Sequence, residues 1–146
     1  MTGRAPSGHA NDVRTISFSR LMTTRWLRVL GIVLLLGGVG HVSGVTHLYI
    51  TQGLPEANRV LIDMWVGEAQ LLAGALYLAA FRASRQGAPW RALAAFGAFT
   101  IFGYAVAILP VLFARAPALF RVPAIIYLVS SVGVLASTMT ASDVRR

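Results

Sequence analysis

The fold is decided by residues 27–49, which read LRVLGIVLLLGGVGHVSGVTHLY. With its histidines taken as neutral, this run holds one charged residue, Arg28, close to its start. A helix needs about 20 predominantly apolar residues to cross a hydrocarbon core of about 30 Å. The sequence therefore predicts that residues 27–49 cross a membrane as a helix.

Three more apolar runs of similar length follow, at residues 60–81, 92–113 and 122–139. Membrane barrels would instead show segments of about ten residues with alternating polarity. The runs predict an all-α integral membrane protein whose membrane domain covers residues 26–140.

The connections between these runs are short, at residues 50–59, 82–91 and 114–121. Short links favour antiparallel neighbours, so we expect an antiparallel four-helix bundle. Glycine and proline occur together at residues 53–55 and 87–89, which is typical of turns.

Composition supports the same class. The chain has 146 residues, of which 56% are hydrophobic and 12% charged, whereas soluble domains carry about 25% charged residues. An ordinary soluble enzyme and a disordered chain are both excluded. The chain has no cysteine, which excludes disulfides, thiolate metal sites and cysteine nucleophiles.

The net charge of +8 comes from 13 arginines, against five acidic residues. These arginines flank the apolar runs and form no single basic face, so we expect no nucleic-acid partner. With the N-terminus inside, ten arginines lie inside and three outside, which predicts that both termini are cytoplasmic. We expect a multi-pass protein of the bacterial plasma (inner) membrane, with residues 1–25 as a mobile tail and residues 141–146 as a second cytoplasmic tail.

Polar residues inside the predicted spans are candidates for a site, because ionisable groups are costly within a membrane. They are His41, His47, Asp63, Glu68 and Gln70. At about 1.5 Å per residue, His41 and Glu68 both lie about 12 Å from the outer boundary, and His47 and Asp63 about 3–5 Å. We expect basic and acidic side chains to meet at these two levels, either as a functional site or as structural contacts between helices.

Glycines favour close packing of the first two helices. Gly37, Gly40 and Gly44 share a narrow stripe, and Gly67 and Gly74 align on the second helix. Small residues at such spacing let transmembrane helices approach closely. No metal or cofactor motif is present, and two histidines six residues apart on one helix do not share a face. We therefore expect neither a metal nor a cofactor.

The segment from Asn58 to Gly74, NRVLIDMWVGEAQLLAG, resembles the second span of small DoxX-like bacterial membrane proteins. Trp65, Gly67 and Gly74 match the aromatic–x–Gly element of that group and the glycine about seven residues later. The Phe-Gly-Tyr sequence at residues 102–104 fits loosely, and the resemblance covers residues 27–139. It implies a four-helix membrane architecture.

Three functions remain open. The first is a non-enzymatic accessory or interaction module that contacts the lipid bilayer and either a membrane-protein partner or further copies of itself. The second is a small proton-coupled transporter that uses Glu68. The third is an enzyme acting on a lipid or quinone, with His41 and Glu68 as acid and base. Short loops and the lack of catalytic motifs favour the first.

Overall fold

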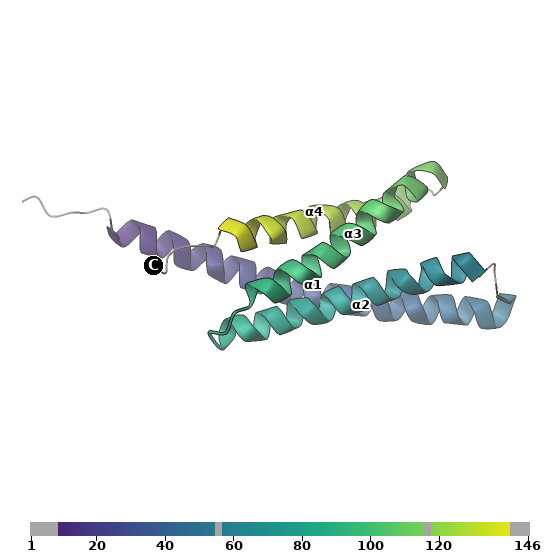
Figure 1. Ribbon diagram of the computed structural model, residues 1–146, viewed down its shortest axis with the longest axis horizontal. Helices are drawn as coiled ribbons and strands as arrows, with labels where there is room; N and C mark the ends of the chain where they lie inside the picture. The colour runs from purple at the N-terminus through teal and green to yellow at the C-terminus, as the bar shows by residue number, and fades with distance from the viewer. Residues whose placement is uncertain (1–8, 55–56, 116–117, 141–146) are drawn as a thin grey trace, which may run out of the picture.

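The computed structural model describes the backbone of residues 9–54, 57–115 and 118–140, and the side chains of residues 24–54, 60–110, 113 and 121–139. In this part of the chain there are four helices and no strand (Figure 1): α1 (His9–Gln52), α2 (Ala57–Arg85), α3 (Arg91–Arg115) and α4 (Ala118–Thr140). The prediction of an all-helical, four-helix fold is confirmed.

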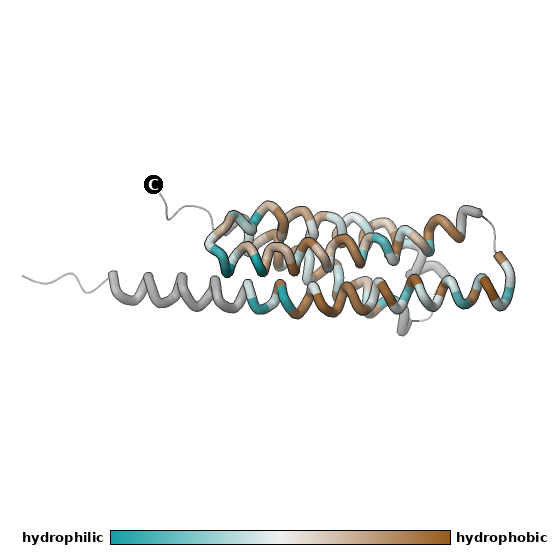
Figure 2. The backbone as a smooth tube through the Cα atoms, turned by 90° about the horizontal axis from the view of Figure 1, so that it is seen from below, coloured by the Kyte–Doolittle hydropathy of each residue, from teal (hydrophilic) through white to brown (hydrophobic). Residues whose placement is uncertain are grey.

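Each helix contains a segment that is long and apolar enough to cross a membrane. The four segments are Thr24–Gln52, Val60–Arg85, Arg91–Pro110 and Arg121–Met139. Figure 2 shows apolar residues along all four helices, and hydrophilic residues gathered at the end where α2 meets α3. Length and composition therefore make this chain a candidate four-span membrane protein.

The first helix begins earlier than expected. The sequence places residues 1–25 in a mobile tail ahead of the first span, but α1 already starts at His9. Residues 9–25 contain no glycine or proline, so nothing stops a helix formed in the apolar run from growing backward. Residues 9–25 therefore belong to α1, and the mobility of the tail stays a prediction. Residues 1–8 and 141–146, the rest of the two predicted tails, lie outside the described residues.

Two glycine turns end α1 and α2, as the sequence predicts. Gly53 has a φ of 86° and Gly87 a φ of 71°, which are left-handed values that favour glycine. The Gly53 amide donates to the Tyr49 carbonyl at 3.1 Å, and the Ala88 amide donates to the Ala83 carbonyl at 2.9 Å. These bonds satisfy terminal carbonyls and stop each helix, which allows the chain to reverse.

The bundle consists of two antiparallel hairpins. The pairs α1–α2 and α3–α4 pack along their lengths, and contacts between α2 and α3 join the hairpins. In Figure 1 the two hairpins lie close together at the end of the α2–α3 turn and diverge toward the other end. The former end carries Arg25, Arg28, Arg82, Arg85 and Arg91, and we call it the arginine-rich end.

Glycines set the register of the first hairpin. A methyl group on Gly74 would lie 2.9 Å from the Gly31 carbonyl oxygen, and one on Gly38 would lie 3.1 Å from the Gly67 carbonyl oxygen. Both pairs fit one antiparallel register, in which the helix backbones nearly touch. Close packing through Gly67 and Gly74 therefore involves Gly31 and Gly38 on α1.

The expected glycine stripe on α1 has a different role. A methyl group added to Gly40 or Gly44 would have no atom of the described residues within 4 Å, and both glycines are exposed, so they face away from α2. Gly37 faces Gln70 and Tyr127 instead. The prediction that Gly40 and Gly44 pack against α2 is wrong because the helices meet on a face rotated toward Gly38.

Small side chains make up much of the main core. Ala73, Ala80, Ala94 and Ala98 are each fully buried there, beside larger residues such as Leu27 and Tyr77. Many other large apolar side chains point outward, including Leu36, Ile50, Phe96, Phe99 and Val129, each at least 65% exposed. Small residues at helix contacts and large apolar residues outside suit a bundle whose solvent is hydrocarbon.

Candidate functional site

A hydrogen bond between α1 and α2 lies near their connecting loop. The Tyr49 hydroxyl donates to Asp63 Oδ2 at 2.6 Å, a length typical of a bond to an ionised carboxylate. Helical side chains lean toward their own N-terminus, so on antiparallel helices these two side chains lean toward each other. Tyr49, and not the expected His47, therefore meets Asp63.

His41 bonds to the backbone of α2. Its Nε2 lies 2.9 Å from the Asp63 carbonyl oxygen, and because a carbonyl only accepts, Nε2 must carry the proton. The expected contact between His41 and Glu68 is absent from the hydrogen bonds of the described residues. The glycine register explains this, since Gly67 faces α1 and the next residue is rotated by about 100°.

Glu68 lies on the outer surface of α2. It is exposed, and no hydrogen bond or ion pair to its side chain occurs within the part of the chain that the structure describes. It borders an open cavity of about 380 Å³, together with Leu61, Ile62, Met64 and Trp65. A carboxylate thus stands alone on an apolar surface, about 12 Å along α2 from Val60 at 1.5 Å per residue.

Trp65, on the same surface of α2, packs against α3. Its ring meets the Tyr104 ring of α3 edge to face, with 6.2 Å between centroids and 82° between planes, a geometry that aromatic pairs favour. Half of Trp65 nevertheless remains exposed, at 49%. His47, on α1, is also exposed, so the five predicted site residues do not form one cluster.

Gln70 is the buried member of the predicted set. Its Nε2 donates to the Tyr127 hydroxyl of α4 over a long 3.5 Å, and its Oε1 is buried without a hydrogen-bond partner in the described part of the chain. A methyl group on Gly37 would lie 3.4 Å from that oxygen. The Gln70 side chain of α2 therefore lies between Gly37 of α1 and Tyr127 of α4.

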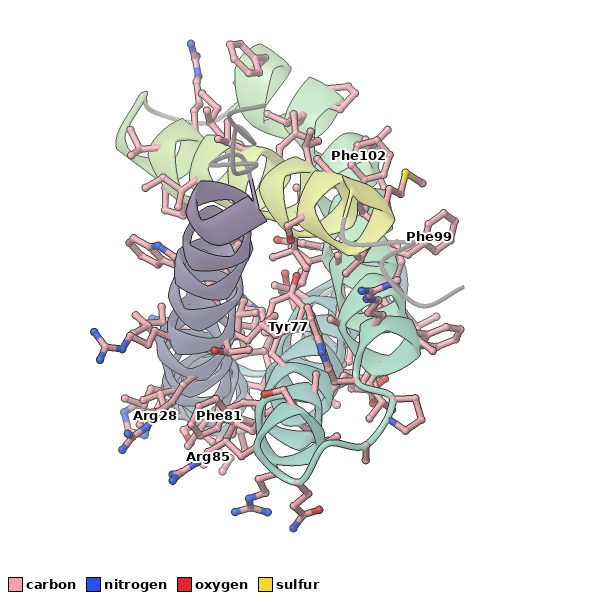
Figure 3. All side chains as sticks on the ribbon, turned by 90° about the vertical axis from the view of Figure 1, so that its left-hand side faces the viewer. Arg28, Tyr77, Phe81, Arg85, Phe99 and Phe102 are labelled. Carbon is pink, nitrogen blue, oxygen red and sulfur yellow. The ribbon has the colours of Figure 1, made fainter. Side chains whose placement is uncertain are left out.

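Sequence reasoning missed the tyrosines as interior residues. The chain has four, one on each helix, and Tyr49, Tyr77 and Tyr104 are buried. Tyr77 is 1% exposed, and its hydroxyl has no partner among the described residues; Figure 3 shows it between the helices. The signal that could have found them was the occurrence of one tyrosine in each predicted span, because a tyrosine ring is large and apolar enough to be buried between helices.

This arrangement joins helices, and within the described ranges it does not bring His41 and Glu68 together as an acid–base pair. His41 and Asp63 are bonded through the backbone, while Glu68 faces away from both. No three histidine, aspartate or glutamate side chains of the described residues are placed to hold a metal ion. Among the described residues, His41 and Glu68 therefore do not form the acid–base pair expected for the lipid or quinone enzyme.

Comparisons with protein-family models, curated proteins and solved structures give no match. Any functional assignment must therefore rest on the geometry of these residues.

Proposed function

We propose that this chain is a non-enzymatic interaction module of the bacterial plasma membrane. In this proposal, the outer surface of α2 around Trp65 and Glu68 docks against a transmembrane helix of a partner protein. That helix presents a cation or a hydrogen-bond donor at the level of Glu68.

The exposed Glu68 carboxylate is the observation that carries this proposal. Ionisable residues within membrane spans almost always face a protein interior or a water-filled cavity, because contact with hydrocarbon is costly. Glu68 instead shares an open surface with Leu61, Ile62 and Trp65. A partner helix with a donor would remove the carboxylate from lipid and satisfy it.

A second copy of the chain suits this surface less well. Most homodimers have two-fold symmetry, so the same patch meets itself. Such a dimer would bring two Glu68 carboxylates to the same depth, and like charges repel strongly at low dielectric. A partner with the opposite charge or a donor avoids this repulsion.

The proposal includes the orientation and the family. Ten arginines on one side favour the cytoplasm for the arginine-rich end and for both termini. Membership of the DoxX-like group is proposed on the resemblance around Trp65, Gly67 and Gly74. In this chain Gly67 and Gly74 pack closely against α1, which explains why glycine is needed at these two positions.

Reversing the charge of Glu68 tests the function. We expect the wild-type chain, extracted in mild detergent, to migrate on a native gel as a complex with a second protein. Glu68→Gln retains a hydrogen-bonding side chain and should keep part of that complex. Glu68→Lys should release the free 15.6 kDa chain, because a cation would face the donor of the partner.

The matched control is Val129→Lys. Val129 is 66% exposed on α4, so this change places the same cation on another outer surface. We expect the complex to survive in this variant. Loss of the complex in both variants, survival in Glu68→Lys, or a complex that contains only this chain would each contradict the proposal.

A further inference from the structure

A basic groove lies between α1 and α2 at the arginine-rich end of the bundle. It has a volume of about 520 Å³ and is lined by Arg28, Leu78, Phe81, Arg82, Arg85 and Gln86. Figure 3 views the molecule from this end and shows Arg28 of α1 gathered with Phe81 and Arg85 near the end of α2. Three cations from two helices thus surround one cavity.

The charge of this groove is not balanced by the neighbouring sequence. Residues 24–31 of α1 and residues 76–95 around the α2–α3 turn contain no aspartate or glutamate. Arg82 and Arg85 lie in the last turn of α2, where the helix dipole favours positive charge. The dipole does not account for Arg28, which comes from α1 and adds a third positive charge to the same cavity.

The groove is apolar on its other side. The Arg28 guanidinium lies 5.8 Å from the centre of the Phe81 ring, a cation–π distance that holds the arginine over the groove. Leu78 continues the apolar lining. Ile32, one helical turn beyond Arg28 on the same side of α1, is 42% exposed. A ligand here would meet cations at one end and hydrocarbon at the other.

We propose that this groove binds the phosphate of an anionic phospholipid, with the acyl chains lying along the apolar surface beyond Phe81. Arginine is well suited to this role, since its planar guanidinium can donate two parallel hydrogen bonds to a phosphate. Basic pockets between transmembrane helices are a recurrent place for acidic head groups. The apolar lining selects a lipid over a free phosphate ion.

Native mass spectrometry of the full chain tests this site. The chain is purified in a neutral detergent and titrated with dioleoyl phosphatidylglycerol, dioleoyl phosphatidylcholine or inorganic phosphate. We expect one phosphatidylglycerol to be retained per chain, with weaker retention of phosphatidylcholine and no competition from phosphate. Equal retention of the two lipids would overturn the proposal. Displacement of phosphatidylglycerol by millimolar phosphate would also overturn it, because it would show that the groove binds a free anion.

Single substitutions locate the binding. Each of Arg28→Gln, Arg82→Gln and Arg85→Gln should weaken phosphatidylglycerol retention about fivefold, since one basic residue near a membrane surface contributes about 1 kcal/mol. Arg25→Gln is the charge-matched control, because Arg25 lies on the same helix and does not line the groove. An equal loss in Arg25→Gln would show general charge attraction and overturn the site.

A second measurement does not depend on the variants folding. Phosphatidylglycerol should raise the midpoint of thermal unfolding of the wild-type chain in neutral detergent, because a ligand that binds only the folded state stabilises it. Phosphatidylcholine at the same concentration should raise it less. Identical shifts for both lipids would contradict the proposal even if every arginine variant failed to fold.

Discussion

Replacing Gly74 by alanine probes a close backbone contact between α1 and α2. The added methyl group would lie 2.9 Å from the carbonyl oxygen of Gly31 and 2.9 Å from the backbone nitrogen of Leu35. Backbone atoms cannot rotate away, so α1 and α2 must separate by several tenths of an ångström. The other contacts of this interface, including that of Gly38 with Gly67, would loosen as well.

The expected cost follows from two opposing effects. Overpacking a tight interior costs about 1–3 kcal/mol, while alanine stabilises a helix by about 1 kcal/mol relative to glycine. Two of the three nearest atoms belong to the backbone and the third is Leu35 Cγ. Since backbone atoms put the overpacking cost in the upper part of its range, we expect Gly74→Ala to lower the free energy of unfolding by about 1–2 kcal/mol. Unfolding is measured by circular dichroism during titration of dodecylmaltoside micelles with sodium dodecyl sulfate.

Gly40→Ala is the matched control. It adds the same methyl group to the same hairpin, but none of the residues that the structure describes comes within 4 Å of the added atom. This variant should be unchanged or more stable by up to about 1 kcal/mol, from helix propensity alone. Equal destabilisation by both substitutions, or a larger loss for Gly40→Ala, would refute the packing register.

Four further outcomes are expected. Tyr49→Phe removes the bond to Asp63 and should cost about 1–2 kcal/mol; a double-mutant cycle with Asp63→Asn should show coupling, and additive effects would contradict the contact. Gln70→Leu should change the free energy of unfolding by less than about 1 kcal/mol, because the lost bond is long and one buried oxygen is already without a partner; a large loss would mean that the amide is better satisfied than we infer. Deleting residues 1–19 should leave membrane insertion intact in a protease-protection assay, since the flanking arginines that remain still favour the same orientation; failed insertion would give the first turns of α1 a structural role. An alkaline phosphatase fusion after Arg85 should be inactive, as a cytoplasmic position requires, and high activity would reverse the proposed topology.

The four apolar helices were predictable because a candidate membrane span has a length and composition that the sequence displays directly. Residues 60–81 and 122–139 are predicted from apolarity alone and lie within α2 and α4. The helix ends were less predictable. Helix formation is cooperative, so α1 and α2 extend beyond their apolar runs until Gly53 and Gly87 stop them.

The orientation of side chains around each helix could not be derived in the same way. A soluble helix shows its buried face through the contrast between apolar and polar residues. Here both faces are apolar, so Ala73 inside and Leu72 outside look alike in hydropathy. Depth along the helices placed His41 and Glu68 at one level, but depth says nothing of rotation about the helix axis, and that rotation turns Glu68 outward.

Residue size is the better guide in this chain. Gly31, Gly38, Gly67 and Gly74 recur at seven-residue intervals on two neighbouring helices and face one another. The sequence pattern that favoured Gly40 and Gly44 was their closer spacing, yet both are exposed. A shared interval on two successive spans therefore predicts their contact better than one small-xxx-small pattern on a single span.

The central claim is that a partner helix covers the surface of α2 around Glu68, and photo-crosslinking in living cells tests it most directly. A benzoylphenylalanine residue replaces Leu72, which is 50% exposed one turn from Glu68, or Phe99, which is 68% exposed on α3. We predict that position 72 forms an adduct with a transmembrane segment of a different protein, that Glu68→Lys abolishes this adduct, and that position 99 does not form it. Adducts of position 72 with lipid alone, or only with another copy of this chain, would contradict the claim.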